Sequence, residues 1–78
     1  MSRREKLLDK MKRTPGKIRP GEVEALLRIE GFEIVNRRGS HDTYQRIDGR
    51  IVVFVRPHGG QTTCHPRDIR RIPEALNR

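Results

Sequence analysis

Apolar residues in this 78-residue chain fall into short periodic blocks separated by glycine and proline. The first block places Leu7, Leu8 and Met11 about one helical turn apart and predicts a short helix. Thr14-Pro15-Gly16 ends that helix. Because its apolar stripe is narrow, we expect the helix either to dock loosely on the rest of the chain or to order only with a partner.

A second block predicts a helix over residues 22–30, opened by Pro20-Gly21. Gly31 is well placed to end this helix in the left-handed conformation, and Phe32 would fold back over the last turn. The expected buried face is formed by Val23, Leu26 and Leu27.

Three strands are predicted next, over residues 32–36, 41–47 and 51–56. Asp48-Gly49 separates the last two and is a strong signal for a two-residue hairpin turn. With such a turn, Ile47 faces Arg50 and His41 faces Arg56. A slip of one residue would break this pairing, and the sequence leaves that alternative open.

Directly opposed residues share a sheet face, so this register sorts the hairpin into two faces. One face has the greater apolar bulk and is expected to pack against the helices; it carries Asp42, Tyr44, Arg46, Ile51, Val53 and Val55. The other is expected to stay open and carries His41, Thr43, Gln45, Val52, Phe54 and Arg56. His41 and Arg56 are therefore predicted to lie together on the open face.

A last helix is predicted to begin at Pro66, with Ile69 and Ile72 as its core contacts. Pro73 is expected to interrupt it, by a kink or by a new turn that runs to Leu76. Apart from the N-terminal segment, the order is a helix, three antiparallel strands and a helix. This order predicts an α+β fold in which helices cover one face of a three-stranded sheet.

Charge narrows the range of partners. Lys and Arg number 18 against 10 Asp and Glu, which gives a net charge of +8. Such a balance predicts a polyanionic partner: nucleic acid, an anionic membrane or an acidic protein. The longest apolar run, Ile51 to Val55, is far shorter than the ~20 residues of a membrane span. The N-terminus lacks a signal-peptide pattern and Cys64 is a single cysteine, so we expect a cytoplasmic protein.

Cleavage of RNA is one chemistry that these residues suit. RNA carries its own nucleophile, the 2′-hydroxyl, and histidine is a natural proton carrier near neutral pH. His41 is the candidate base, and Arg56 or the loop arginines Arg37 and Arg38 would stabilise the charged phosphorane. Four residues ahead of His41 would contact phosphate: Arg37, Arg38, Gly39 and Ser40. From these residues alone, a histidine that only hydrogen-bonds near a strand end is the simpler alternative.

Other polar and aromatic residues have weaker interpretations. His58 is either a second proton carrier or a structural residue of the Gly59-Gly60 loop. Asp42 points away from His41 and is expected to pair with an arginine or cap a loop. Cys64 is expected to be a small loop or core residue, and its spacing from the histidines fits no common zinc site. Phe54 is the one aromatic that would face outward as a base-stacking platform.

Taken together, these segments resemble the HicA-type toxins of bacterial toxin–antitoxin pairs, over roughly residues 18–76. The resemblance rests on Leu27-x-x-x-Gly31-Phe32, the basic loop into Gly39-Ser40-His41, Tyr44, and the hairpin that closes in Pro57-His58. The turn Thr63-Cys64-His65-Pro66 and the interruption at Pro73 depart from the family pattern and bear on the surface that contacts an antitoxin. Residues 1–16 look like an N-terminal helical extension to a HicA-like domain over residues 17–78.

The resemblance implies a fold like that of double-stranded-RNA-binding domains and a metal-independent endoribonuclease acting on mRNA, without a cofactor. The family's catalytic histidine corresponds to His41, and Arg46 joins the expected RNA-binding residues. It also implies a HicB-like antitoxin that covers the active site and through which the toxin mainly oligomerises. Two alternatives remain: a non-catalytic RNA-binding module of the same fold, which recognises duplex RNA by shape, and a domain that binds only an acidic protein.

Overall fold

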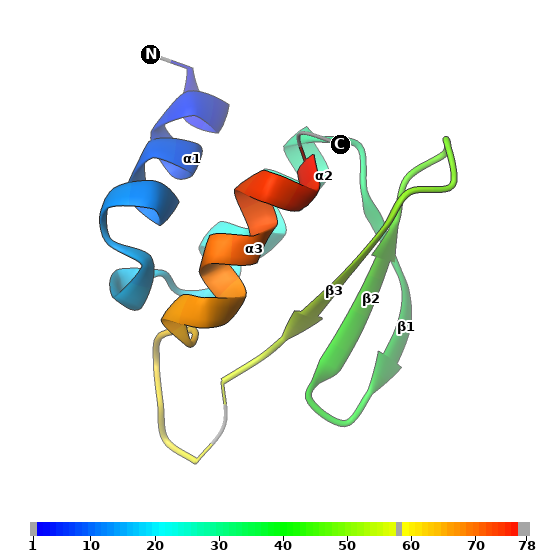
Figure 1. Cartoon of the computed structure of the whole chain (residues 1–78). Helices are drawn as coiled ribbons and strands as arrows, with labels where there is room; N and C mark the ends of the chain where they lie inside the picture. The colour runs from blue at the N-terminus through cyan, green and yellow to red at the C-terminus, as the bar shows by residue number, and fades with distance from the viewer. Residues whose placement is uncertain (1, 58, 77–78) are drawn as a thin grey trace.

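Helices cover one face of a three-stranded antiparallel sheet and leave the other face open (Figure 1). The computed structural model describes residues 2–57 and 59–76. Its elements are α1 (Arg3–Arg13), the 3₁₀ turn η1 (Pro15–Lys17), α2 (Pro20–Ile29), β1 (Glu33–Arg38), β2 (His41–Gln45), β3 (Ile51–Val55) and α3 (Pro66–Leu76). The sheet order is β1-β2-β3, so the predicted α+β fold is confirmed.

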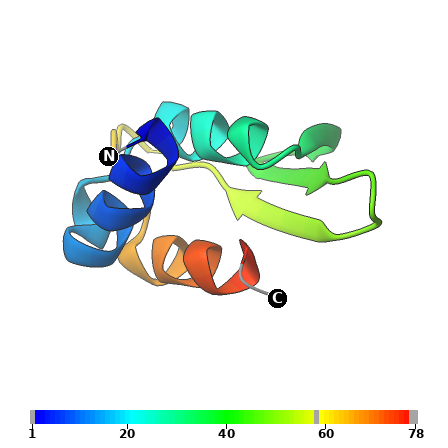
Figure 2. The same cartoon turned by 90° about the horizontal axis from the view of Figure 1, so that it is seen from above.

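The N-terminal helix α1 packs on α2 and α3, on the side away from the sheet (Figures 1 and 2). Met11 is fully buried in the core, and Leu7 and Leu8 are partly buried against it. Lys10 Nζ lies 2.8 Å from Glu22 Oε2 of α2. The narrow stripe predicted from the sequence is therefore sufficient to dock this helix without a partner.

Local sequence signals set both ends of α2. Pro20 takes the first helical position, where its missing N–H costs nothing, so the helix begins two residues earlier than predicted. At the other end Gly31 has φ of +89°. The Phe32 N–H donates to the Leu27 carbonyl at 2.8 Å and the Gly31 N–H donates to the Arg28 carbonyl at 3.0 Å. These two bonds form a Schellman cap, as expected from Gly31-Phe32.

The hairpin between β2 and β3 has a register one residue away from the predicted one. Arg46 N–H donates to the Arg50 carbonyl at 2.9 Å, and the three-residue loop between them ends at Gly49 with φ of +90°. This is a turn closed by a glycine bulge, which adds one residue to the expected two-residue connection. His41 consequently faces Val55, and Tyr44 faces Val52.

The slip exchanges the two faces of β3 and corrects two expectations. Val52 and Phe54 point into the core, with Phe54 only 1% exposed, so Phe54 is not a stacking platform. Ile51 and Val53, expected inside, lie on the open face with exposed fractions of 56% and 57%. On β2 the prediction was right, because Asp42 and Tyr44 face the helices.

Helix α3 runs as one helix through Pro73 to Leu76, so the alternative of a new turn starting at Pro73 is wrong. Pro73 removes one backbone bond, but its ring is buried where α3 meets α1, beside Met11. The start of α3 is capped by His65, whose Nδ1 accepts from the Arg67 N–H at 3.1 Å. Ile69, Ile72 and Leu76 supply its core contacts.

The Schellman cap gives a stability prediction with a built-in control. Gly31→Ala forces a side chain into a left-handed conformation and is expected to lower the free energy of unfolding by about 1–2 kcal/mol. Gly21→Ala lies in the first turn of the same helix, where an added methyl group meets no atom within 4 Å. It is expected to be neutral or to stabilise by up to about 1 kcal/mol. Urea unfolding of both variants tests this; equal effects would contradict it.

Candidate functional site

His41 lies at the first position of β2, directly after the tight turn that joins β1 to β2. Gly39 has φ of +59° at the first central position of this two-residue turn, as a type II′ hairpin requires. Because side chains alternate along a strand and Asp42 points into the core, the exposed His41 side chain points to the open face. The imidazole is thus presented to solvent, as predicted.

The guanidinium that shares this face with His41 is that of Arg38 and not that of Arg56. The turn makes Arg38 and His41 directly opposed partners, and opposed side chains lie on one face with Cβ atoms about 5 Å apart. The predicted cross-strand pair of His41 with Arg56 is wrong because the hairpin slips by one residue. Gly39-Ser40 was the sequence signal for the correct neighbour, since a two-residue turn pairs the residues that flank it.

Asp42, the next residue, holds the opposite face together. Its side chain is fully buried, and two guanidiniums meet it: Arg37 Nε lies 3.1 Å from Oδ1, and Arg56 Nε lies 3.1 Å from Oδ2. The expectation that Asp42 pairs with an arginine is confirmed. These contacts join β1, β2 and the residue after β3 through one carboxylate.

Arg56 also braces the turn that carries His41. Its backbone N–H donates to the Ser40 carbonyl at 2.8 Å, and its Nη2 donates to the Gly39 carbonyl. Together with the Asp42 ion pair, these bonds direct the Arg56 guanidinium toward the protein. Arg56 is therefore a positioning residue for the turn rather than the open-face partner of His41.

Of the other predicted site residues, Arg46 lies beyond the far end of β2, about 16 Å from His41 along the strand. It sits over the Phe32 ring at 5.1 Å and its Nη2 is 2.7 Å from Asp48 Oδ2. The hydrogen bond from Arg46 lowers the pKa of Asp48 to about 2. His58 lies outside the described residues.

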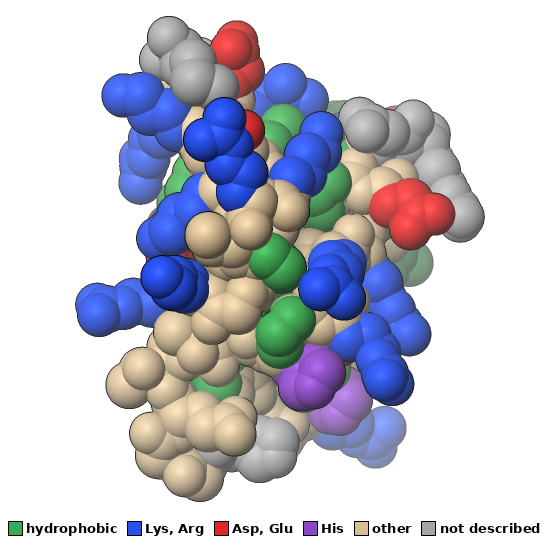
Figure 3. Space-filling view, turned by 60° about the vertical axis from the view of Figure 1, so that its left-hand side comes forward, with side chains coloured by type: hydrophobic (Ala, Val, Ile, Leu, Met, Phe, Trp, Pro, Cys, Tyr) green, Lys and Arg blue, Asp and Glu red, His purple; other side chains and the backbone are tan. Residues whose placement is uncertain are grey.

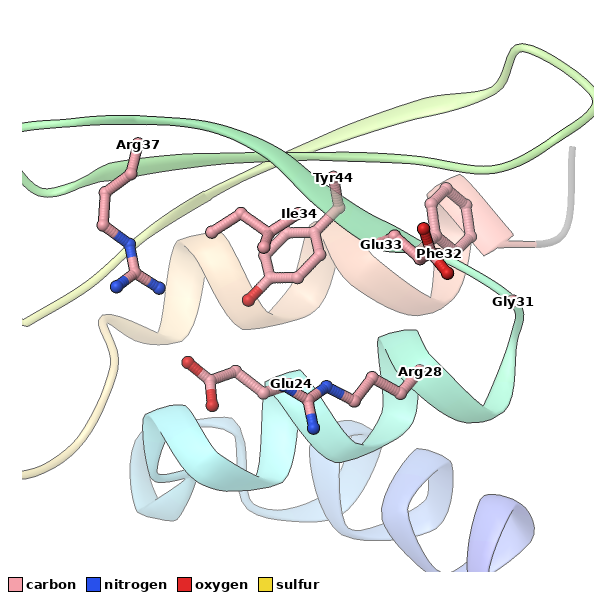
Figure 4. Close-up of a pocket in the computed structure, with 8 residues that line it drawn as sticks. All are labelled: Glu24, Arg28, Gly31, Phe32, Glu33, Ile34, Arg37 and Tyr44. Carbon is pink, nitrogen blue, oxygen red and sulfur yellow. The ribbon is translucent and has the colours of Figure 1, made fainter.

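A hollow of about 540 Å³ lies between α2 and β1, and His41 is not among the residues that line it (Figure 4). Its charged lining is mixed, with Glu24 and Glu33 against Arg28 and Arg37. Burial, followed by the charges of Glu24 and Asp42, raises the pKa of Tyr44. Because the two signs of charge balance, this hollow is poorly suited to phosphate, and the cationic turn at His41 is the better candidate site.

The surroundings of His41 are basic, in keeping with the net charge of +8. Figure 3 shows Lys and Arg side chains spread over one face of the molecule, with histidine side chains among them. A smaller groove of about 310 Å³ runs beside β3 and includes His41 in its lining. The arrangement suits a polyanion that lies across the open face.

Comparison with known proteins gives one match. A family model described as HicA toxin of bacterial toxin-antitoxin matches residues 21–76, from the second residue of α2 to the last residue of α3. Neither the curated proteins nor the solved structures contain a match to this chain.

The buried ion pairs predict a large effect of removing one charge. Asp42→Asn is expected to lower the free energy of unfolding by about 2–3 kcal/mol, because two guanidiniums lose their carboxylate. The expected loss is smaller than for a fully buried ion pair, since the side chains of Arg37 and Arg56 are 55% and 34% exposed. Asp48→Asn, in the exposed pair with Arg46, is the control and should change stability much less, because solvent screens this pair and an asparagine oxygen can still accept from the Arg50 N–H. Urea unfolding distinguishes them, and similar losses would refute the assignment.

Cys64 gives a second prediction. Burial, with Asp68 and Glu22 nearby, raises the pKa of its thiol to about 11. Its reactive thiolate is therefore scarce at pH 8, and the buried sulfur is shielded. Iodoacetamide should modify the native protein at pH 8 much more slowly than the urea-unfolded protein, as followed by mass spectrometry. Rapid modification of the native chain would show an exposed, activated thiol instead.

Proposed function

We propose that this chain, which belongs to the HicA toxin family of bacterial toxin–antitoxin systems, acts by cleaving RNA. The observation that carries the proposal is the exposed His41 on the open face, opposite Arg38, on a turn braced by Arg56. A proton carrier fixed beside a cation matches what RNA cleavage needs from a protein.

In the proposed reaction His41 removes the proton of the ribose 2′-hydroxyl. The 2′-oxygen attacks the adjacent phosphorus, a 2′-O–P bond forms and the P–O5′ bond breaks. The leaving 5′-oxygen takes a proton from water or from the imidazolium, so the products are a 2′,3′-cyclic phosphate and a 5′-hydroxyl. His58 remains a proposed second proton donor. These proton transfers balance the reaction without a metal ion or cofactor.

Phosphate binding is proposed for the basic turn. Arg38 replaces Arg56 as the group that stabilises the phosphorane, because it shares the face of His41. The Arg37 Nε pairs with Asp42, but the Arg37 side chain is 55% exposed. Its other guanidinium N–H groups can therefore donate to phosphate. Gly39 admits the RNA backbone closely, and the Ser40 hydroxyl donates to a phosphate oxygen. Arg46, at the far end of β2, would contact RNA away from the cleaved bond.

As a toxin of a toxin–antitoxin system, the protein has an antitoxin as partner. We propose that this antitoxin is HicB-like, that it drives oligomerisation, that the substrate is mRNA and that the pair acts in the cytoplasm. The division into an extension over residues 1–16 and a domain over residues 17–78 is part of the same proposal. Within residues 2–57 and 59–76, no helix has the length and apolar character to cross a membrane.

Substitution of His41 tests the proposal. His41→Ala is expected to slow cleavage of end-labelled RNA by about 10²–10⁴-fold, the contribution typical of a general base. His65→Asn is the matched control: it alters the other described histidine, which caps α3, and asparagine is also a good helix cap. It should cleave at the wild-type rate, with products that carry a cyclic phosphate.

Cleavage by His41→Ala at the wild-type rate would remove His41 from the mechanism. If the wild-type protein retards the RNA in a gel but leaves it intact, the function is that of a non-catalytic RNA-binding module. If it neither cleaves nor binds RNA with salt-dependent affinity, the basic surface serves a protein partner alone.

A further inference from the structure

The two edges of the sheet differ in how they are protected from further strand pairing. The β1 edge contains a bulge between Ile34 and Asn36 and carries Glu33, Arg37 and Arg38. Bulges and charges are the usual means by which an edge strand avoids new partners. The β3 edge, from Ile51 to Val55, has no bulge and contains no charged residue, proline or glycine. The β3 edge therefore lacks these protections.

The backbone of β3 also presents its bonding groups outward. Arg56 N–H donates to the Ser40 carbonyl, and hydrogen-bonded pairs alternate along an antiparallel ladder. Val52 and Phe54 therefore bond to β2, whereas the N–H and C=O groups of Ile51, Val53 and Val55 point away from the sheet. In the described part of the chain β3 is the last strand, so no further strand meets these groups.

The space beside this edge is a groove with a helix as its other wall. It has a volume of about 310 Å³ and is lined by β3, by His41 of β2, and by Asp68, Arg71, Ile72 and Ala75 of α3. At one end the Arg50 guanidinium donates to the Leu76 carbonyl at 3.3 Å, which ties the start of β3 to the end of α3. A groove between a strand edge and a helix is the geometry in which extended peptides add to a sheet.

Charge identifies the kind of segment that would fit. The chain carries a net charge of +8, Arg71 lines the groove, and the Arg50 guanidinium lies at one end of it, bonded to the Leu76 carbonyl. Asp68 is the single carboxylate among the described residues that line it. A second copy of the chain would bring another +8 to the same place, so an acidic strand from a different protein is the better complement.

We propose that β3 is a docking edge for an extended segment of the antitoxin, in which acidic residues alternate with apolar ones. The segment adds as a fourth strand; side chains on one face contact Ile72 and Ala75, and those on the other extend the exposed row of Ile51 and Val53. The inference requires the antitoxin partner of the proposed function but does not require RNA cleavage.

Amide hydrogen exchange of the full chain tests strand addition directly. The probe is a synthetic peptide of alternating Glu and Val, and the control is a peptide of the same composition with all Glu before all Val. At a peptide concentration ten times its Kd, exchange of the Ile51, Val53 and Val55 amides should slow about tenfold. The Val52 and Phe54 amides are already bonded to β2 and should change little. Uniform protection, no protection, or equal effects of both peptides would overturn the proposal.

A backbone variant supplies the second arm. Val53→Pro removes an outward N–H, and proline is tolerated on a strand edge at such a position. It should abolish peptide binding, whereas Val53→Thr keeps both the N–H and the β-branched shape and should bind. If Val53→Pro does not fold, Val53→Glu replaces it, because this side chain is 57% exposed and a like charge there repels the acidic peptide. Unchanged peptide binding by the folded variant would refute the docking edge.

Two further readouts separate this inference from other occupants and from RNA cleavage. Light scattering that shows a wild-type dimer lost in Val53→Pro would assign the edge to a second copy. Loss of RNA binding without loss of peptide binding in that variant would assign it to nucleic acid. Either result overturns the proposal. RNA cleavage by the wild-type protein is measured in parallel. If the RNA stays intact but the amides of Ile51, Val53 and Val55 are protected, the proposed RNA cleavage fails and the docking edge stands.

Discussion

One buried carboxylate organises the end of the sheet on which the candidate site depends. Asp42 is removed from water, and a charge in that position destabilises the fold unless it is paired. Arg37 and Arg56 supply the pairing from the strand before it and from the residue after β3. The strands therefore meet at their basic end through a charge of opposite sign, and the turn that carries His41 is held by the same residues.

Because side chains alternate along β2, the buried carboxylate that stabilises the sheet and the candidate histidine lie on opposite faces. Asp42 and its arginines occupy the helix-facing side, and His41 and Arg38 occupy the open side one residue away. Arg56 directs its contacts inward to Asp42, Gly39 and Ser40. The positive charge that this turn leaves exposed to solvent thus includes Arg38 and the exposed part of Arg37.

The sequence predicted the features that depend on local chemistry. Gly31-Phe32 ends α2 by a cap that involves only the last turn, and Pro66 begins α3 for an equally local reason. No new turn starts at Pro73, and its ring is buried where α3 meets α1, a contact that local sequence does not reveal. Likewise, Met11 docks α1 through tertiary packing that a narrow apolar stripe alone does not establish.

The register of the hairpin could not be predicted from the sequence, because polar and apolar residues do not alternate along β3. Asp48-Gly49 fits a two-residue turn, and it also fits a three-residue loop that ends in a glycine bulge. On β2, Tyr44 marks the buried face, so that strand was assigned correctly. All five residues from Ile51 to Val55 are apolar, and either face of β3 would serve as a core face. The error in pairing His41 with Arg56 followed from this one ambiguity.

The absence of alternation in β3 has a physical meaning beyond the ambiguity it creates. A strand that is apolar on both faces is typical of sheets covered on both sides, whereas an open antiparallel sheet has polar residues on its outer face. Here the helices cover Val52 and Phe54, and Ile51 and Val53 remain exposed. The composition of β3 therefore fits a strand that is covered on both faces, and its exposed Ile51 and Val53 leave apolar surface beside the proposed docking edge for a partner to cover.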